Sequence, residues 1–103
     1  MAKYQIMYWH DIPLQIKVTD ESGTVKQALP ARFQQAINSA SIARGKYEEN
    51  AYMNGWRWGA RETREGNATI VAQALLNELA ETYPQERLRE LLIGHAKKKI
   101  TLA

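Results

Sequence analysis

The chain contains no cysteine. Disulfide bonds, thiolate catalysis, cysteine-ligated zinc and iron–sulfur clusters are therefore excluded. No segment approaches the about 18 consecutive apolar residues that a membrane-spanning helix needs, and the first residues lack the apolar run of a signal peptide. We therefore expect a cytoplasmic protein with no membrane partner.

The chain also lacks a strong overall charge, since its net charge is only +3. Basic and acidic residues balance over residues 1–83. The excess comes from residues 84–103, where two acidic residues face five basic ones: Arg87, Arg89, Lys97, Lys98 and Lys99. The sequence thus predicts a basic C-terminal segment and no basic field over the whole molecule.

What is present is typical of one globular domain. The 103 residues suffice for a single hydrophobic core, and 45% of them are hydrophobic and 24% charged, as in ordinary globular proteins. We find no internal repeat, linker or low-complexity segment. We therefore expect a single domain over residues 1–103.

The first third of the chain predicts three strands. Residues 3–9 are rich in aromatic and β-branched side chains, and residues 14–19 alternate between apolar and polar. Residues 20–23 form a predicted turn that begins with Asp20 and ends with Gly23, after which residues 24–29 can run back. An antiparallel three-stranded meander is the simplest arrangement.

The rest of the chain predicts mainly helices. Pro30 suits the first turn of a helix that ends near Gly45, and residues 46–54 predict a short second helix. Asn67 is a suitable N-cap for the helix with the strongest apolar stripe, residues 68–83. Pro84 begins a shorter helix, and we expect the tail from residue 94 to fray or to pack loosely. The predicted fold class is α+β, with the later helices packed on one face of the N-terminal meander.

Residues 51–59, AYMNGWRWG, are the richest stretch in large side chains. Trp56 and Trp58 alternate as in a strand, whereas residues 61–66 suggest a polar loop. Three interpretations are open for these indoles: they seal the core, they form an interface together with Arg57, or they stack nucleic-acid bases.

Several segments together resemble a small bacterial family. These are YQIMYWHDIPLQIKV, LPARFQQAI, and YMNGWRWG followed by a helix that ends in ETYP. The family is known as a "virulence factor" domain, a term that describes a phenotype and no mechanism. The resemblance covers nearly the whole chain. It implies a domain that stands alone or lies in longer proteins beside an iron–sulfur-scaffold-like domain and helical repeats. It supplies no catalytic residue.

The sequence contains no recognisable catalytic or cofactor motif. His10 and Asp11 are adjacent, so in an extended chain they point to opposite sides, and we expect Asp11 to bind nearby backbone amides in a turn. No spacing of His10, His95 and carboxylates suits a metal. Neither a nucleophile elbow nor a phosphate-binding glycine loop is present. We therefore expect no catalytic residue, metal or cofactor.

The function that the sequence favours is a non-catalytic adaptor or protein-interaction domain, with an unknown protein partner and an unknown oligomeric state. The expected contact surface consists of Trp9, His10, Asp11, Tyr52, Trp56, Arg57 and Trp58. The alternative is binding of RNA or another single-stranded nucleic acid. Its expected residues are Arg57, Arg61, Arg64, Lys97, Lys98 and Lys99. Binding of a small ligand, or a minor enzymatic activity, is the third possibility.

Overall fold

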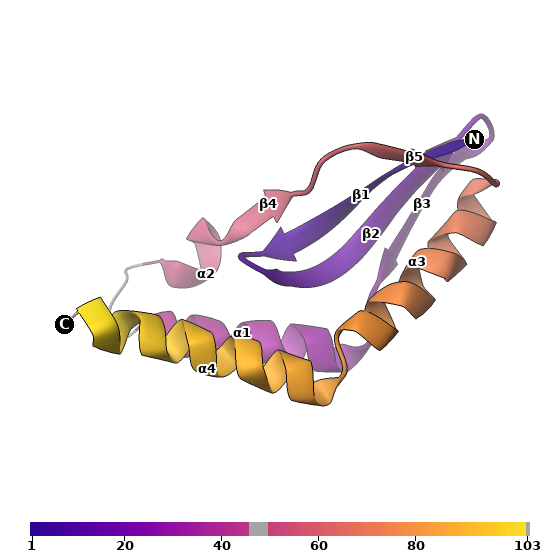
Figure 1. Cartoon of the computed structure of the whole chain (residues 1–103). Coiled ribbons are helices and arrows are strands. Elements are labelled where there is room, and N and C mark those ends of the chain that lie inside the picture. Colours follow the sequence, from indigo (N-terminus) through magenta and orange to yellow (C-terminus); the bar gives the residue numbers. More distant parts are fainter. Residues whose placement is uncertain (46–49, 103) are drawn as a thin grey trace.

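The structure is a computed structural model that describes residues 1–45 and 50–102, with side chains up to His95 apart from that of Ala51. Figure 1 shows one antiparallel sheet with helices on one side of it. The predicted α+β class is confirmed.

The sheet begins with the predicted meander. Its strands are β1 (Ala2–Trp9), β2 (Ile12–Asp20) and β3 (Gly23–Ala28). β1 and β2 are antiparallel, with Ile6 opposite Ile16. Asp20 forms the β2–β3 turn as predicted, because its Oδ1 accepts hydrogen bonds from the backbone N–H groups of Ser22 and Gly23 at 2.7 and 3.1 Å. Gly23 has a φ of 147°, a region that favours glycine.

Two short strands from the centre of the chain complete the sheet. β4 (Trp56–Trp58) and β5 (Glu62–Arg64) both pair with β1, so the sheet has five strands. β4 lies beside the second half of β1 and β5 beside its first half. The prediction of a polar loop over residues 61–66 is therefore wrong for the segment that forms β5. This segment, Glu-Thr-Arg, is polar because it lies at an exposed sheet edge.

The helices follow the predicted order. α1 (Ala31–Gly45) buries Phe33, Ala36, Ile37 and Ala40, as its spacing indicates. α2 (Ala51–Asn54) covers the end of the predicted second helix, whose residues 46–49 lie outside the described residues. α3 (Ala68–Thr82) is capped by Asn67, whose Oδ1 accepts from the N–H of Ile70 at 2.9 Å. The N-cap prediction is confirmed.

The last helix is longer than predicted. α4 (Gln85–Leu102) continues through Gly94, where a frayed tail was expected. It packs along α1 (Figure 1). The expected fraying is wrong for this backbone, because His95, one residue beyond Gly94, is only 4% exposed and anchors the helix.

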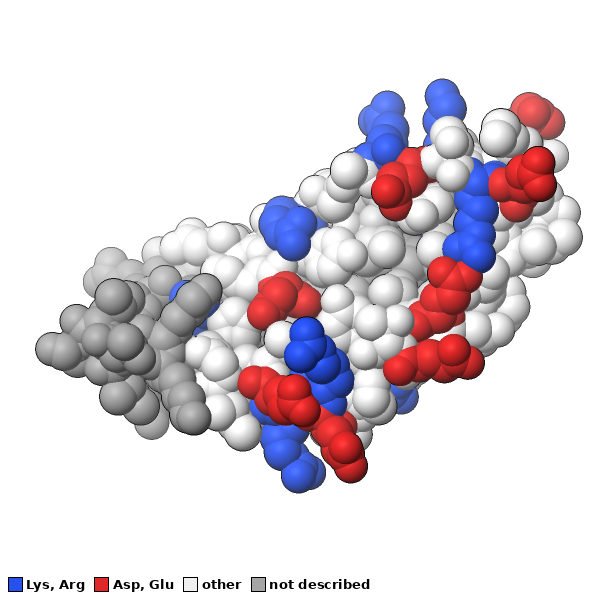
Figure 2. All heavy atoms as spheres, in the orientation of Figure 1, with Lys and Arg blue, Asp and Glu red and all other residues white. Residues whose placement is uncertain are grey.

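One core lies between the sheet and the helices. It combines the inward side chains of β1 and β2 with the apolar faces of α1 and α3, and Leu88 adds α4 to it. Acidic and basic side chains are mixed over α4, whereas the charged side chains of α3 itself are all acidic (Figure 2). In the described part of the chain, no helix is long and apolar enough to cross a membrane.

Candidate functional site at the end of the sheet

The β1–β2 turn and the α2–β4 connection meet at one end of the sheet. His10 has a φ of 54°, which reverses the chain directly after β1. Its N–H donates to the carbonyl of Gly55 at 2.8 Å, and its own carbonyl accepts from Nε of Arg57 at 3.1 Å. The second bond joins residues 47 positions apart, so the predicted contact residues His10 and Arg57 do lie together.

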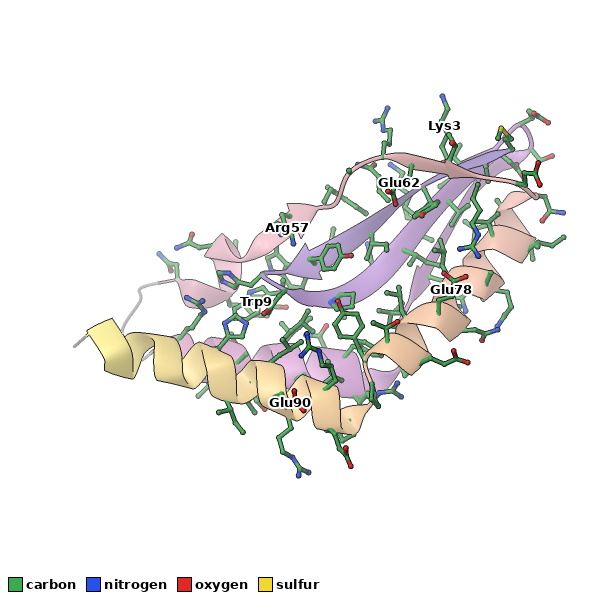
Figure 3. The ribbon with its side chains drawn as sticks, in the orientation of Figure 1. Lys3, Trp9, Arg57, Glu62, Glu78 and Glu90 are labelled. Carbon is green, nitrogen blue, oxygen red and sulfur yellow. The ribbon has the colours of Figure 1, made fainter. Side chains whose placement is uncertain are left out.

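Trp9 belongs to the core. Its side chain is 0% exposed, and its indole N–H donates to the carbonyl of Tyr52 at 3.0 Å. Figure 3 shows it between the sheet and the helical layer. A fully buried indole cannot form part of a contact surface, so the expectation that Trp9 does so is wrong. Trp9 instead supports the residues that are exposed, since it holds α2 in place.

The other two indoles differ from each other. Trp56 is half-buried, packs against the core and meets the ring of Tyr52 edge to face at a centroid distance of 5.5 Å. Trp58 is 41% exposed, and Nζ of Lys17 lies 5.8 Å from its ring centroid. The interpretation that an indole seals the core therefore holds for Trp56, while Trp58 is available at the surface.

Asp11 reaches across the fold to α4. Its Oδ1 lies 2.7 Å from Nε2 of His95, 84 residues along the chain, and the Nε–H of Arg44 on α1 donates to Nδ1 of the same ring at 2.8 Å. Since Nδ1 accepts, the ring proton is on Nε2 and donates to Asp11. The expectation that Asp11 binds only local backbone amides is therefore incomplete. Sequence reasoning missed both His95 and Arg44, which carry no local signal of their own.

The surroundings of Asp11 also set its charge. Partial burial acts to raise the pKa of its carboxyl, but the hydrogen bond and the electrostatic interaction with His95 outweigh this, so the pKa is lowered. The carboxylate therefore stays ionised in the folded protein at neutral pH. The chain from Asp11 through His95 to Arg44 connects the β1–β2 turn, α4 and α1.

An open depression of about 280 Å³ lies over this cluster and is lined by His10, Asp11, Arg44, Arg57 and His95. His95 is buried and uses both ring nitrogens, so it cannot exchange a proton with a substrate without breaking a bond within the fold. Within the described ranges, no three histidine or carboxylate side chains are grouped so that they could hold a metal ion.

The large exposed side chains at this end of the sheet come from α2 and β4. Tyr52 is 42% exposed and Met53 71%, and Arg57 and Trp58 follow on the edge strand β4, where they point to opposite faces of the sheet. We call these four residues the α2–β4 surface. Met53 was not among the predicted contact residues, although its place beside Tyr52 in the aromatic stretch was a usable signal. The guanidinium of Arg57 lies 4.6 Å from the ring centroid of Tyr8.

The residues expected to bind nucleic acid are not brought together. Arg57 is engaged with Tyr8 and His10, and Arg64 forms a two-pronged ion pair with Glu78 of α3. Arg61 lines a groove on the face of the sheet that is turned away from the helices. The side chains of Lys97, Lys98 and Lys99 lie outside the described residues.

Comparisons with known proteins show which family the chain belongs to. A family model described as "Virulence factor" matches residues 7–92. Conserved virulence factor C of Staphylococcus aureus (strain MRSA252) is 29% identical over 91% of this chain and 24% of its own length. The uncharacterized protein YpgR of Bacillus subtilis (strain 168) is 31% identical over 95% of this chain and 25% of its own. The chain thus spans about a quarter of these relatives. No solved structure matches.

Proposed function

We propose that this chain, which belongs to the Virulence factor family, is a non-catalytic protein-interaction domain of the cytoplasm that binds a protein partner through the α2–β4 surface. The observation that carries the proposal is the exposure of Tyr52, Met53 and Trp58 beside Arg57. Tryptophan, tyrosine and arginine are the residues that most often dominate the energy of protein interfaces.

The packing beneath this surface supports the proposal. Tyr52 is held by the bond from Trp9 to its carbonyl and by its ring contact with Trp56. Arg57 is held by its bond to the carbonyl of His10. Side chains that are already ordered lose less conformational entropy when a partner binds, so the surface is well suited to binding. Asp11 and His10 lie beside it and complete a polar rim.

The sheet edge adds a second feature that suits a protein partner. β4 is the last strand of the path β3-β2-β1-β4, so its outer side has no neighbouring strand among the described residues. An extended peptide can pair with such an edge through main-chain hydrogen bonds, while its side chains contact the flanking aromatic residues. We expect the partner to present an extended segment with acidic side chains facing Arg57.

Site-specific photo-crosslinking tests the proposal. A photoreactive amino acid replaces Met53 in one variant and Ile70 in another. Ile70 is 62% exposed in the first turn of α3, and α3 begins at the end of the molecule opposite α2 (Figure 1). We expect one protein of the bacterial host to crosslink at position 53 and not at position 70. The same crosslink should disappear when Arg57→Ala is added to the position 53 variant.

Two outcomes of the crosslinking would contradict the proposal. Equal labelling from both positions, or a crosslink that survives the loss of the Arg57 side chain, would show that the α2–β4 surface is not a specific binding site. A circular dichroism melt of each variant checks that the fold is kept, as expected for substitutions at exposed positions.

A further inference from the structure

The face of the sheet turned away from the helices has a charge pattern that the linear sequence hides. In an antiparallel sheet, residues opposite each other share a face. Lys17 lies opposite both Gln5 on β1 and Lys26 on β3, and Lys3 lies opposite Thr19. All three lysines of the strands are therefore on this outer face. Lys3 points away from the helical layer in Figure 3.

The acidic residues of the strands are all on the other face. Oδ2 of Asp20 accepts from the N–H of Ala68 at the start of α3, at 2.7 Å. Oε2 of Glu62 accepts from the hydroxyl of Tyr4, whose partner on β2 is the buried Val18. The strand arginines Arg57 and Arg64 lie on this face as well. In the described strands, the helix side of the sheet is thus of mixed charge, whereas the charged side chains of the outer face are all lysines. The balanced sequence of residues 1–83 conceals this basic face.

A groove crosses the outer face. It has a volume of about 230 Å³ and is lined by Lys3, Tyr4, Gln5, Lys17, Thr19 and Arg61. Arg61 comes from the connection between β4 and β5, so it adds a fourth cation to the three lysines. Trp58 lies at the same face, because the ammonium group of Lys17 sits 5.8 Å from its ring centroid.

The direct opposition of Lys17 and Lys26 is unfavourable without a ligand. Like charges at opposite positions in neighbouring strands destabilise a sheet. A bound polyanion would remove this repulsion and release counterions.

Two uncharged side chains lie between the cations. The amide of Gln5 donates to the carbonyl of Gly59 at 3.2 Å, and the hydroxyl of Thr19 is hydrogen-bonded to that of Thr24 at 3.0 Å. Each keeps further hydrogen-bonding capacity, because an amide and a hydroxyl can each form more than one bond.

From this arrangement we propose that the outer face of the sheet binds single-stranded RNA. Lys3, Lys17, Lys26 and Arg61 contact the phosphates, and Trp58 stacks on a base. Gln5 and Thr19 contact 2′-hydroxyl groups, which distinguish RNA from DNA. This site goes beyond the proposed protein interaction: it shares Trp58 with the α2–β4 surface but does not use Tyr52, Met53 or Arg57. It also differs from the C-terminal lysines and central arginines that the sequence suggested, since only Arg61 is common to both sets.

Fluorescence anisotropy with a labelled single-stranded RNA of mixed sequence and about 12 nucleotides tests the proposal. Four phosphate contacts predict a log–log dependence of affinity on salt with a slope of about −3. Lys17→Gln combined with Lys26→Gln should weaken binding at low salt about tenfold or more and reduce the slope to about −1.5. The melting temperature of this variant should stay equal or rise, because the opposed charges are gone.

The matched control is Lys97→Gln combined with Lys98→Gln, which makes the same chemical change on α4. We expect it to bind RNA like the unmodified protein. Trp58→Ala should weaken binding about tenfold, as for loss of one stacked base. RNA should also quench the emission of the unmodified protein more than that of the Trp58→Ala variant.

Four results would overturn the proposal. If only the α4 variant loses binding, the C-terminal lysines bind RNA instead. If single-stranded DNA of the same sequence binds equally well, the assignment to RNA is wrong. If poly-glutamate competes as effectively as unlabelled RNA, the face is a site for an acidic protein. If no binding occurs even at low salt, the lysines serve only to keep the sheet from pairing with other chains. Crosslinking at position 53 should be unaffected by the lysine changes, so the two proposals can fail independently.

Discussion

Gly55 lies directly against the indole of Trp9, so that a Cβ on residue 55 would come within 2.5 Å of Nε1. The same Cβ would lie 2.7 Å from the ring of His10. The indole cannot retreat, because it is buried and its Nε1 is bonded to Tyr52. The glycine at this position is therefore required by close packing and not by a special backbone angle, since its φ is −89°.

Gly55→Ala should therefore destabilise the protein by about 1–3 kcal/mol, as other overpacked core positions do. Gly94→Ala is the matched control. It lies within α4, and a Cβ there meets nothing within 4 Å. Alanine is the better helix former, so this change should stabilise the protein by about 0.4–1 kcal/mol. Urea denaturation measures both values. Equal effects of the two substitutions would contradict the packing of Gly55 on Trp9.

The three tryptophans should rank in stability according to their burial. Trp9→Ala removes a fully buried side chain and should cost about 3–5 kcal/mol. Trp58→Ala removes an exposed one and should cost less than about 1 kcal/mol, while Trp56→Ala should fall between the two. Denaturant unfolding of the three variants provides the comparison. A large loss of stability in Trp58→Ala would mean that the Trp58 side chain is covered by other residues in the free protein.

His95 should contribute to stability although a frayed tail was expected around it. His95→Ala removes its packing beside Trp9 and its bonds to Asp11 and Arg44, and we expect a cost of about 2–4 kcal/mol. Asp11→Ala should cost less than about 1.5 kcal/mol, because the carboxylate is 55% exposed and water can replace part of the bond. If thermal melts show no loss of stability for His95→Ala, this part of α4 is a frayed tail in solution.

Asp20 should make stability sensitive to acid. Hydrogen bonds from the backbone N–H groups of Ala68, Ser22 and Gly23 lower the pKa of its carboxyl, with the bond from Ala68 the largest cause. A group whose pKa is lower in the folded state stabilises the protein above its unfolded pKa of about 4 and loses that effect as the pH falls through the folded pKa. Asp20→Asn should therefore lower the melting temperature at pH 7, and the difference from the unmodified protein should shrink below pH 4.

That shrinkage follows from the backbone hydrogen bonds that the Asp20 carboxylate accepts. Glu21→Gln, next in the sequence and exposed in the same turn, is the control and should leave the melting temperature nearly unchanged over the same pH range. A constant difference for Asp20→Asn from pH 7 to pH 2 would show that the carboxylate does not hold the start of α3.

Local patterns in the sequence were sufficient for most elements. The alternation of residues 14–19 gave β2, Asp20 and Gly23 gave its turn, and Asn67 gave the start of α3. Each of these signals is local, because the residue and the group that it contacts are at most a few positions apart. The apolar spacing of α1 also matched the residues that it buries.

Contacts between distant residues could not be predicted in this way. A polar strand at a sheet edge looks like a loop until its neighbour is known, and the neighbour of β5 is β1, about sixty residues earlier. The contact between Asp11 and His95 has the same character. The basic outer face has the same character, because its three lysines come from three different strands and only strand pairing brings them together.

The position of β1 has a consequence for how the chain is made. One side of this strand can pair with β2 as soon as β2 has been synthesised. Its other side stays unpaired until β4 and β5 have been synthesised. At a synthesis rate of about 5–20 residues per second, roughly 2–7 s pass between the emergence of β3 and that of β5. During this interval β1, the aromatic strand, is an edge strand of the nascent meander and exposes unpaired main-chain groups. Such edges pair readily with other chains, so a ribosome that stalls before Trp56 would release a fragment prone to aggregate.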